Sequence, residues 1–279
     1  MRPRNRLARV ARPITFLSDY GTADEFAGVC RAVIARIAPD AAVIDITHGL
    51  PRHAVRQGAV VLANAVPYAE PGIHLAVIDP GVGSERRPVA VLAHQDERIF
   101  VGPDNGVLAL ALEHAGGAAA AADLTTSPFR LEPVTATFHG RDIFAPVSAR
   151  LALGASLQEA GEEIDPASLT RLELPEPRIY PDRVVAHVTY VDAFGNVALN
   201  LAHRDLAATF LRLGHRITVQ TPQAKVSIPF ARTFTDVGEG QGLLYEDSAS
   251  SLALAVNRES AAEMLGLSPD DEVTLSPAG

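Results

Sequence analysis

Several residue types are scarce in this chain, and each shortage excludes a class of protein. It has one cysteine, Cys30, which rules out a disulfide framework and a cysteine-ligated metal site. Tryptophan is absent and aromatic residues make up 5% of the 279, yet 47% of the residues are hydrophobic, enough for a globular fold with a full core. No run of 18 apolar residues occurs, so no membrane-spanning helix is expected.

Positive charge is also in short supply, except at the N-terminus. The formal net charge of −9 argues against broad contact with nucleic acid or with an anionic membrane. Residues 1–12 carry five arginines but lack the apolar stretch of a signal peptide. We therefore expect a disordered basic tail over 1–12 and a cytoplasmic location.

Hydrophobic periodicity divides the chain into two domains of different type. Over 13–177, short apolar runs alternate with helical patterns, which predicts an α/β domain whose central sheet is mostly parallel. The segment 172–183 holds three prolines and has the composition of a linker. Over 178–279 the helical patterns nearly vanish, and short strands between turns predict a smaller all-β, barrel-like domain.

A capping box is expected before the first helix. Thr22 would be the N-cap and Glu25 the third helical residue, ahead of an apolar face that begins at Phe26. Asp24 would then lie at the helix N-terminus, where a negative charge is favoured whether or not it binds a ligand.

The most informative motif is Asp-Pro-Gly-Val-Gly-Ser-Glu-Arg-Arg over 79–87. It follows the apolar run 73–78, which has the pattern of a buried strand. The turn residues allow the backbone to approach a ligand closely, and Asp79 and Arg86 can fold toward one another around a small polar molecule. The simpler alternative is a tight turn with a surface ion pair.

Two more segments of the first domain place candidate ligand-binding residues at the end of a predicted strand or the start of a predicted helix. Asp19 follows the first predicted strand, where open α/β sheets bind ligands, and a carboxylate there suits the vicinal hydroxyls of a ribose. No G-x-G-x-x-G run accompanies it. Phe138, His139 and Gly140 precede a predicted helix and suit a pocket wall with one titrating group, although a lone histidine is more often structural.

One segment of the second domain joins them. In the segment 192–196, Phe194 can stack on a flat base and Asn196 can recognise the edge of that base. The simpler interpretation of this segment is a β-hairpin turn without a binding role. A metal site with oxygen and nitrogen ligands is a further alternative, but neither an H-x-x-x-H nor an H-E-x-x-H spacing supports it. The candidate ligands of such a metal site are Asp19, Asp24, His48, His53, Asp79 and His139.

Together these segments resemble the S-adenosyl-L-methionine hydroxide adenosyltransferase family, relatives of the bacterial fluorinase and chlorinase. The residues that carry the likeness are Phe-Leu-Ser-Asp-Tyr-Gly-Thr over 16–22, the turn 79–86, Thr-Phe-His-Gly-Arg-Asp over 137–142, Phe-Gly-Asn over 194–196, and the late pairs at 247–248 and 256–257. The resemblance covers about 14–275. It implies an α/β domain followed by a β-barrel, and a homotrimer with each site between two subunits.

The family's reaction and residues can be placed on this sequence as expectations. S-adenosylmethionine and water would give adenosine and L-methionine without metal or cofactor. The catalytic set falls on Asp79, Arg86 and His139, and the ribose ligand on Asp19. The remaining substrate-binding positions are Asp24, Asp192 and Ser248 at the methionine end, Phe194, Asn196 and the backbone near Arg258 at the adenine, and Phe138.

Departures from the halogenases favour water as the nucleophile. Those enzymes carry tyrosine where this chain has Asp79 and serine where it has Gly140, and an extra loop of the fluorinase is missing. His53 replaces a fluorinase tryptophan and Ala249 an arginine, so the contacts at these two positions stay open. A halide-using adenosyltransferase and a non-catalytic protein that binds S-adenosylmethionine or adenosine remain alternatives.

Overall fold

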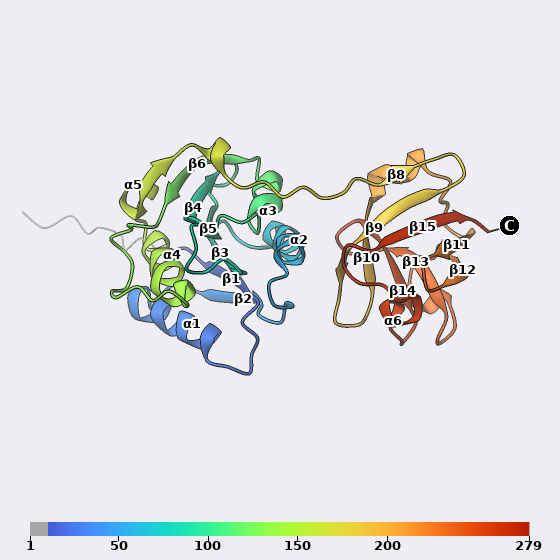
Figure 1. The fold of residues 1–279 in the computed structure, drawn as a ribbon, viewed down its shortest axis with the longest axis horizontal. Coiled ribbons are helices and arrows are strands. Elements are labelled where there is room, and N and C mark those ends of the chain that lie inside the picture. Colours follow the sequence, from blue (N-terminus) through green and yellow to red (C-terminus); the bar gives the residue numbers. More distant parts are fainter. Residues whose placement is uncertain (1–10, 279) are drawn as a thin grey trace, which may run out of the picture. The chain divides into compact units, whose positions relative to one another are not determined.

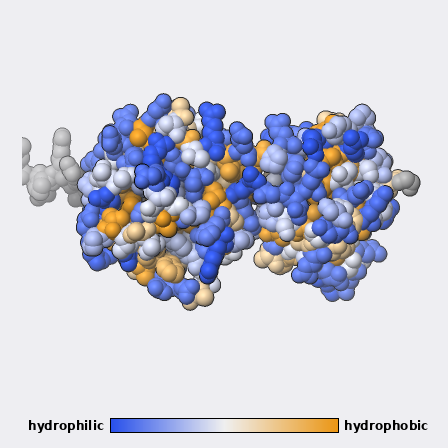
Figure 2. Space-filling view, in the orientation of Figure 1, coloured by the Kyte–Doolittle hydropathy of each residue, from blue (hydrophilic) through white to orange (hydrophobic). Residues whose placement is uncertain are grey.

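The computed structural model describes residues 11–278, and the chain divides into two compact units, Met1–Leu172 and Glu173–Gly279 (Figure 1). Ten of the twelve residues of the predicted basic tail lie outside the described range. Within that range, no helix has the length and apolar character needed to cross a bilayer. On the face drawn in Figure 2, each unit is mostly hydrophilic, with hydrophobic residues scattered between.

The first unit is built on a seven-stranded sheet with the order β2-β1-β3-β5-β4-β6-β7. The neighbours β2, β1, β3 and β5 run parallel, which confirms the predicted parallel core. The other three strands pair antiparallel, so the sheet as a whole is mixed. The strands are β1 (Ile14–Ser18), β2 (Val43–Thr47), β3 (Ile73–Val77), β4 (Pro88–Ala93), β5 (Ile99–Pro103), β6 (Ala118–Asp123) and β7 (Glu162–Ile164).

Helices cover both faces of this sheet. One hydrophobic cluster joins α1 (Phe26–Ile37) and α4 (Ala145–Ala152) to the sheet, and a second joins α2 (Val55–Ala65) and α3 (Ala109–His114) to the other face. β1 and β3 are buried at every position, as expected of strands between two helical layers. The short helices are η1 (Val66–Tyr68), the π-helix η2 (Gly140–Phe144), α5 (Leu157–Ala160) and η3 (Pro166–Ser168).

The predicted capping box before α1 is wrong. Residues 22–25 form bends, the helix begins at Phe26, and its N-cap is Glu25 in helical geometry (φ −75°, ψ −11°) without a side-chain cap. The Phe26 ring packs edge-on against Phe138, with ring centroids 5.2 Å apart. A helix cap and an aromatic pair each contribute about 1 kcal/mol, so a local capping signal does not by itself fix where the helix begins.

The second unit is a near-closed antiparallel barrel, which confirms the predicted all-β domain. Its strand order is β12-β11-β15-β9-β10-β14-β13, with β8 beside β9, and a bridge between Phe230 and Leu244 brings the two edges together. Aliphatic side chains fill its interior. The elements are β8 (Arg178–Ile179), β9 (Val184–Val191), β10 (Val197–Ala202), η4 (His203–Ala208), β11 (Arg216–Gln220), β12 (Lys225–Pro229), η5 (Phe234–Asp236), β13 (Gly242–Glu246), β14 (Ser251–Val256), α6 (Ala261–Leu265) and β15 (Glu272–Pro277).

Candidate active site

A pocket of about 330 Å³ opens in the first unit, beyond the carboxyl ends of β1 and β3. This is where parallel strands of open α/β sheets present their ligand-binding loops. Five of the residues predicted from sequence line it: Asp19, Asp24, Asp79, Phe138 and His139. The other lining residues are Tyr20, Phe26, Arg52, His53, Val82, Thr137 and Gly140.

Arg86 connects two of the predicted catalytic side chains. Its Nε donates to Asp79 Oδ1 at 2.8 Å, and its Nη2 donates both to Asp79 Oδ2 and to His139 Nδ1, the latter at 2.7 Å. The side chains of Arg86 and Asp79 are only 10% and 7% exposed. The pair is therefore buried beside the pocket, and the alternative of a surface ion pair is wrong.

The Arg86 contact also fixes the state of His139. Burial lowers the pKa of the imidazole, and the Arg86 charge lowers it further, while Asp79 and Asp142 act in the opposite direction. A guanidinium has only donors, so Nδ1 must accept the hydrogen bond. His139 is consequently a neutral ring that carries its hydrogen on Nε2.

A π-helix positions His139. His139 precedes η2, and Asp142 within η2 is buried and faces back toward the preceding loop. Its Oδ2 accepts from Thr135 N at 2.8 Å, and its Oδ1 accepts from Arg141 Nε at 2.6 Å. Burial alone would raise the pKa of Asp142, but the hydrogen bonds from Arg141 and Thr135 outweigh it and the pKa is lowered. A charged Asp142 thus anchors the 135–142 segment, and π-helical turns commonly occur at functional sites.

The turn that carries Asp79 lies against that segment. Gly83 has a φ of +77°, and a Cβ there would lie 2.6 Å from the carbonyl oxygen of Ala136. Only glycine allows this approach. A second ion pair on the same turn, Arg87 Nη2 to Asp104 Oδ2 at 2.5 Å, involves no residue that lines the pocket.

Asp19 is held by residues of the loop after β2. Its Oδ2 accepts from His53 N at 2.8 Å, and His53 has a left-handed backbone (φ 66°). Ser18 Oγ contacts His48 Nδ1 at 2.7 Å, and Gly21 N donates to the carbonyl of His48 at 2.7 Å. The sequence suggested His48 only as a metal ligand and gave no signal for Ser18, because the two are thirty positions apart and only the fold brings them together.

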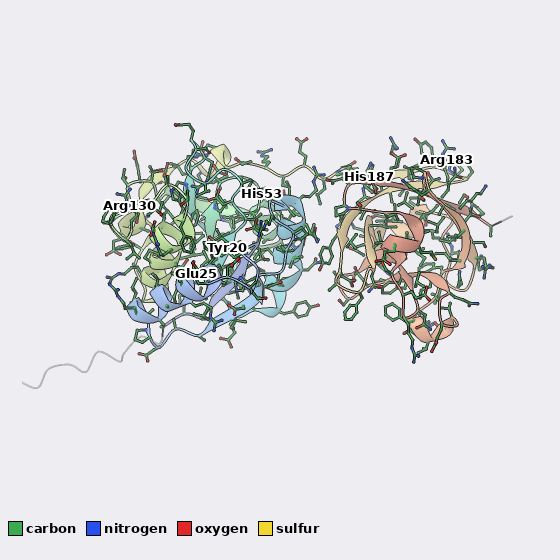
Figure 3. All side chains as sticks on the ribbon, turned by 60° about the horizontal axis from the view of Figure 1, so that its bottom comes forward. Tyr20, Glu25, His53, Arg130, Arg183 and His187 are labelled. Carbon is green, nitrogen blue, oxygen red and sulfur yellow. The ribbon has the colours of Figure 1, made fainter. Side chains whose placement is uncertain are left out.

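Three aromatic rings form one wall of the pocket. Tyr20 lies 5.9 Å from Phe26 and 5.8 Å from Phe138, measured between ring centroids, and Arg141 stacks over Phe138 at 5.1 Å. Figure 3 labels Tyr20, Glu25 and His53 in this unit. Of this trio, only Phe138 was predicted as a site residue. The signal that could have identified Tyr20 is its position directly after Asp19.

The predicted adenine-binding residues lie on the exposed β9–β10 turn of the second unit. Asp192 Oδ1 accepts from Phe194 N at 2.8 Å and from Asn196 N at 2.9 Å, and its Oδ2 accepts from Asn196 Nδ2 at 2.8 Å. These bonds fix the turn and leave the Phe194 ring 81% exposed. Asp192 therefore shapes the turn, and the aromatic ring is free for stacking.

Ser248 and Arg258 lie at opposite ends of β14. Arg258 follows β14 in a left-handed conformation (φ 68°) and pairs with Glu239. Ser260, two residues after Arg258, packs closely on the β9–β10 turn, where a Cβ on Gly195 would lie 2.8 Å from the Cα of Ser260. Arg258 therefore lies near that turn. Ser248 lies in the β13–β14 turn. On the neighbouring strand β13, burial and the nearby carboxylates of Asp247 and Asp192 together raise the pKa of Tyr245 to about 12.

Over residues 11–278, no group of three or more His, Cys, Asp or Glu side chains is arranged to hold a metal ion. The site is instead a carboxylate, a guanidinium and a neutral imidazole around an acidic pocket with an aromatic wall. Together with a parallel-core α/β unit and a C-terminal barrel, it defines a class of two-unit proteins built to bind a small polar ligand.

Comparison with known proteins places the chain within this class. Two family models match it, the SAM hydroxide adenosyltransferase N-terminal domain over residues 14–161 and the C-terminal domain over 186–274. The chain belongs to the SAM hydroxide adenosyltransferase family. The (R)-S-adenosyl-L-methionine hydrolase of Salinispora tropica is 46% identical over 94% of this chain and 97% of that protein.

Two further relatives extend the comparison. The fluorinase of Nocardia brasiliensis is 28% identical over 90% of this chain and 92% of its own length. A crystal structure of a conserved protein from Thermotoga maritima superposes with a TM-score of 0.87 at 33% identity and covers 94% of this chain and 99% of that one.

Proposed function

We propose that this protein hydrolyses S-adenosyl-L-methionine to adenosine and L-methionine, by in-line attack of an oriented water on C5′. The observation that carries the proposal is the buried contact set in which Arg86 holds both Asp79 and His139 at the pocket. Membership of the family and the 46% identity to an (R)-S-adenosyl-L-methionine hydrolase support it.

The chemistry requires little beyond positioning, because the sulfonium leaves as a neutral thioether. The water oxygen forms a bond to C5′, the C5′–S bond breaks, and its electron pair goes to sulfur. Asp79 accepts the proton that the water loses. In favourable cases positioning alone contributes about 7–11 kcal/mol to catalysis.

Arg86 and His139 have supporting roles in this proposal. Arg86 fixes the carboxylate of Asp79 with two hydrogen bonds and holds the imidazole with a third. Because Nδ1 of His139 accepts from Arg86, its Nε2–H is a donor, which suits a contact to the water or to the developing 5′-hydroxyl. His139 is therefore assigned the role of a hydrogen-bond donor and not that of a proton acceptor.

The remaining residues suit a cationic nucleoside. Asp19 would bind the ribose hydroxyls, Asp24 would contribute negative charge for the sulfonium substrate, and Phe138 would form part of the wall. Asp192, Phe194, Asn196, Ser248 and Arg258 of the barrel are proposed to bind the methionine and adenine ends.

We further propose a homotrimer in which a neighbouring subunit supplies those barrel residues. The exposure of the Phe194 ring, which is large and hydrophobic, supports this arrangement. Light scattering on the purified protein tests it, and a monomer at micromolar concentration would contradict it.

One incubation tests the reaction. The purified protein is given the (R) and (S) sulfonium epimers of S-adenosylmethionine separately, with and without chloride, and products are separated by chromatography. Adenosine and methionine from the (R) epimer are expected, as in the name of the Salinispora tropica relative. A 5′-chlorinated nucleoside would instead indicate a halide-using enzyme, and binding without product a non-catalytic protein. Activity is expected to survive dialysis against a chelator, because a neutral leaving group needs no Lewis acid.

A further inference from the structure

The hydroxyl of Tyr20 occupies the place that a side chain at position 140 would take. A Cβ built on Gly140 would overlap Tyr20 Oη and would lie 3.0 Å from Cζ and 3.3 Å from Cε2 of the same ring. Position 140 begins the π-helix η2, directly after His139. Any residue larger than glycine there would therefore push the Tyr20 hydroxyl out of its present position.

The ring of Tyr20 is fixed by its surroundings. Phe26 and Phe138 pack against it on the pocket wall, and Tyr20 lines the same pocket as Asp79 and His139. Burial raises the pKa of the phenol well above its usual value, and the nearby Cys30, Asp79 and Asp19 raise it further against the opposing charge of Arg86. The group is thus a neutral hydroxyl at neutral pH, with one donor and two acceptor sites.

We infer that Tyr20 is a further catalytic residue, whose hydroxyl binds the nucleophilic water together with Asp79, and that Gly140 makes room for it. The inference rests on the hydrolysis proposed above and adds to it the residue that fixes the second hydrogen of the water. One hydrogen points to Asp79 and the other to Tyr20 Oη, which leaves an oxygen lone pair directed at C5′.

The bonds balance without any further reactant. As the water oxygen bonds to C5′, the C5′–S bond breaks with its electron pair on sulfur, and Asp79 takes the proton. Tyr20 keeps its own proton throughout, since its raised pKa makes the phenolate costly. It therefore contributes orientation to the attack, and its loss is expected to affect kcat.

The first test is Tyr20→Phe, which removes the hydroxyl and keeps the ring. Removing a single well-placed hydrogen-bonding group from an active site typically lowers kcat by about 100-fold. We expect a fall of about tenfold to hundredfold, with unchanged KM and unchanged affinity for adenosine. Tyr68→Phe is the matched control, because Tyr68 is 85% exposed on η1 and lies outside the pocket. It is expected to behave as the wild type.

The second test measures the space between positions 20 and 140. Gly140→Ala is expected to lower Tm in the wild-type background. In the Tyr20→Leu background the same change is expected to cost much less, because leucine lacks the Oη, Cζ and Cε2 atoms that the new Cβ would meet. Equal losses of Tm in both backgrounds would overturn the geometric premise.

The outcomes separate this inference from the reaction itself. If the wild type releases no adenosine, the hydrolysis fails and the role of Tyr20 fails with it. If the wild type is active and Tyr20→Phe retains its kcat within about twofold, a difference of less than ~0.5 kcal/mol, only the inference is overturned. A Tyr20→Phe protein that loses adenosine affinity and kcat together would show that the hydroxyl has a structural role, which also overturns it.

Discussion

Arg86 Nη2 donates to His139 Nδ1 over 2.7 Å while Arg86 Nε holds Asp79 at 2.8 Å. One guanidinium thus sets both the orientation of the carboxylate and the tautomer of the imidazole. Burial and this contact together keep His139 neutral, since a protonated ring would place a hydrogen on Nδ1 facing a donor. The roles assigned to the two partners follow from this geometry and lead to the first two predictions.

Asp79→Asn is expected to lower kcat by about 100-fold to 10,000-fold with little change in KM, because the amide cannot accept the proton of the water. The measurement is steady-state release of adenosine. Arg87→Ala is the matched control, since it breaks the neighbouring pair with Asp104 outside the pocket. It is expected to reduce stability and leave kcat intact. A fully active Asp79→Asn protein would remove Asp79 from the mechanism.

Activity is expected to persist below pH 6.5 and to fall as His139 becomes protonated. The pKa of His139 is lowered, so the neutral ring is retained at pH values where an ordinary histidine is half charged. The acidic limb of the kcat profile should shift in His139→Gln, whose amide can still accept from Arg86. An acidic limb identical in both proteins would show that His139 is not the titrating group.

Ser18→Ala is expected to raise KM, by about tenfold, more than it lowers kcat. Ser18 Oγ contacts His48 Nδ1 at 2.7 Å and accepts from Tyr20 N at 3.3 Å, so it helps to hold the loop that carries Asp19. Leaving buried partners unsatisfied costs about 1–3 kcal/mol. Ser148→Ala is the control, because Ser148 is equally buried and its Oγ has no hydrogen-bond partner among residues 11–278. Equal effects of the two changes would contradict the positioning role.

Phe194→Ala is expected to weaken substrate binding and leave the fold unchanged. The ring is 81% exposed, and stacking on a base is worth about 1–3 kcal/mol, so KM should rise roughly tenfold or more. Leu213→Ala, which truncates another exposed hydrophobic residue of the same unit at 46% exposure, is expected to leave KM unchanged. Titration with adenosine gives the same comparison without turnover.

Acid is expected to destabilise the first unit through His74. Its Nε2 accepts from Arg98 at 3.2 Å, and its Nδ1 contacts Thr15 Oγ1 at 2.9 Å. Burial, together with the charges of Arg98 and Arg12, lowers its pKa to about 3. Because the folded pKa lies below the unfolded one, this contribution to stability is complete above about pH 6.5 and is lost as the pH falls toward 3.

The measurement for His74 is urea unfolding between pH 7 and pH 5. His74→Gln is expected to show a smaller loss of stability on acidification than the wild type, since glutamine does not titrate. His203→Gln is the control, because that side chain is 66% exposed and pairs with Glu246 at the surface. A wild-type slope unchanged by His74→Gln would show that other groups control the acid response.

Local patterns in the sequence were sufficient for both folds and for much of the pocket. Strand and helix periodicities predicted the parallel core and the barrel. Asp19 and Asp79 each follow a predicted strand, and both line the pocket because carboxyl ends of parallel strands share one edge of a sheet. The alanine run at 118–122 has little strand propensity by itself, yet it forms most of β6, because pairing with β4 outweighs that propensity.

Interactions between distant segments could not be predicted in this way. α1 begins at Phe26, whose ring packs against the distant Phe138, and not at the local capping signal of Thr22. The contact of Ser18 with His48 and the anchoring of η2 by Asp142 involve hydrogen bonds whose partners no local pattern specifies. Such groups become visible only when the sheet and the loops bring them together.

By itself, the sequence determined which chemical groups this protein brings to its site and at which strand ends they lie, because turn chemistry and hydrophobic periodicity are local properties. Only the tertiary structure decided how those groups act. It buried the pair of Asp79 and Arg86, made His139 a neutral donor, and set the Tyr20 hydroxyl against Gly140. The physical reason is that protonation state, hydrogen-bond direction and available volume depend on neighbours in space, and those neighbours come from segments far apart in the chain.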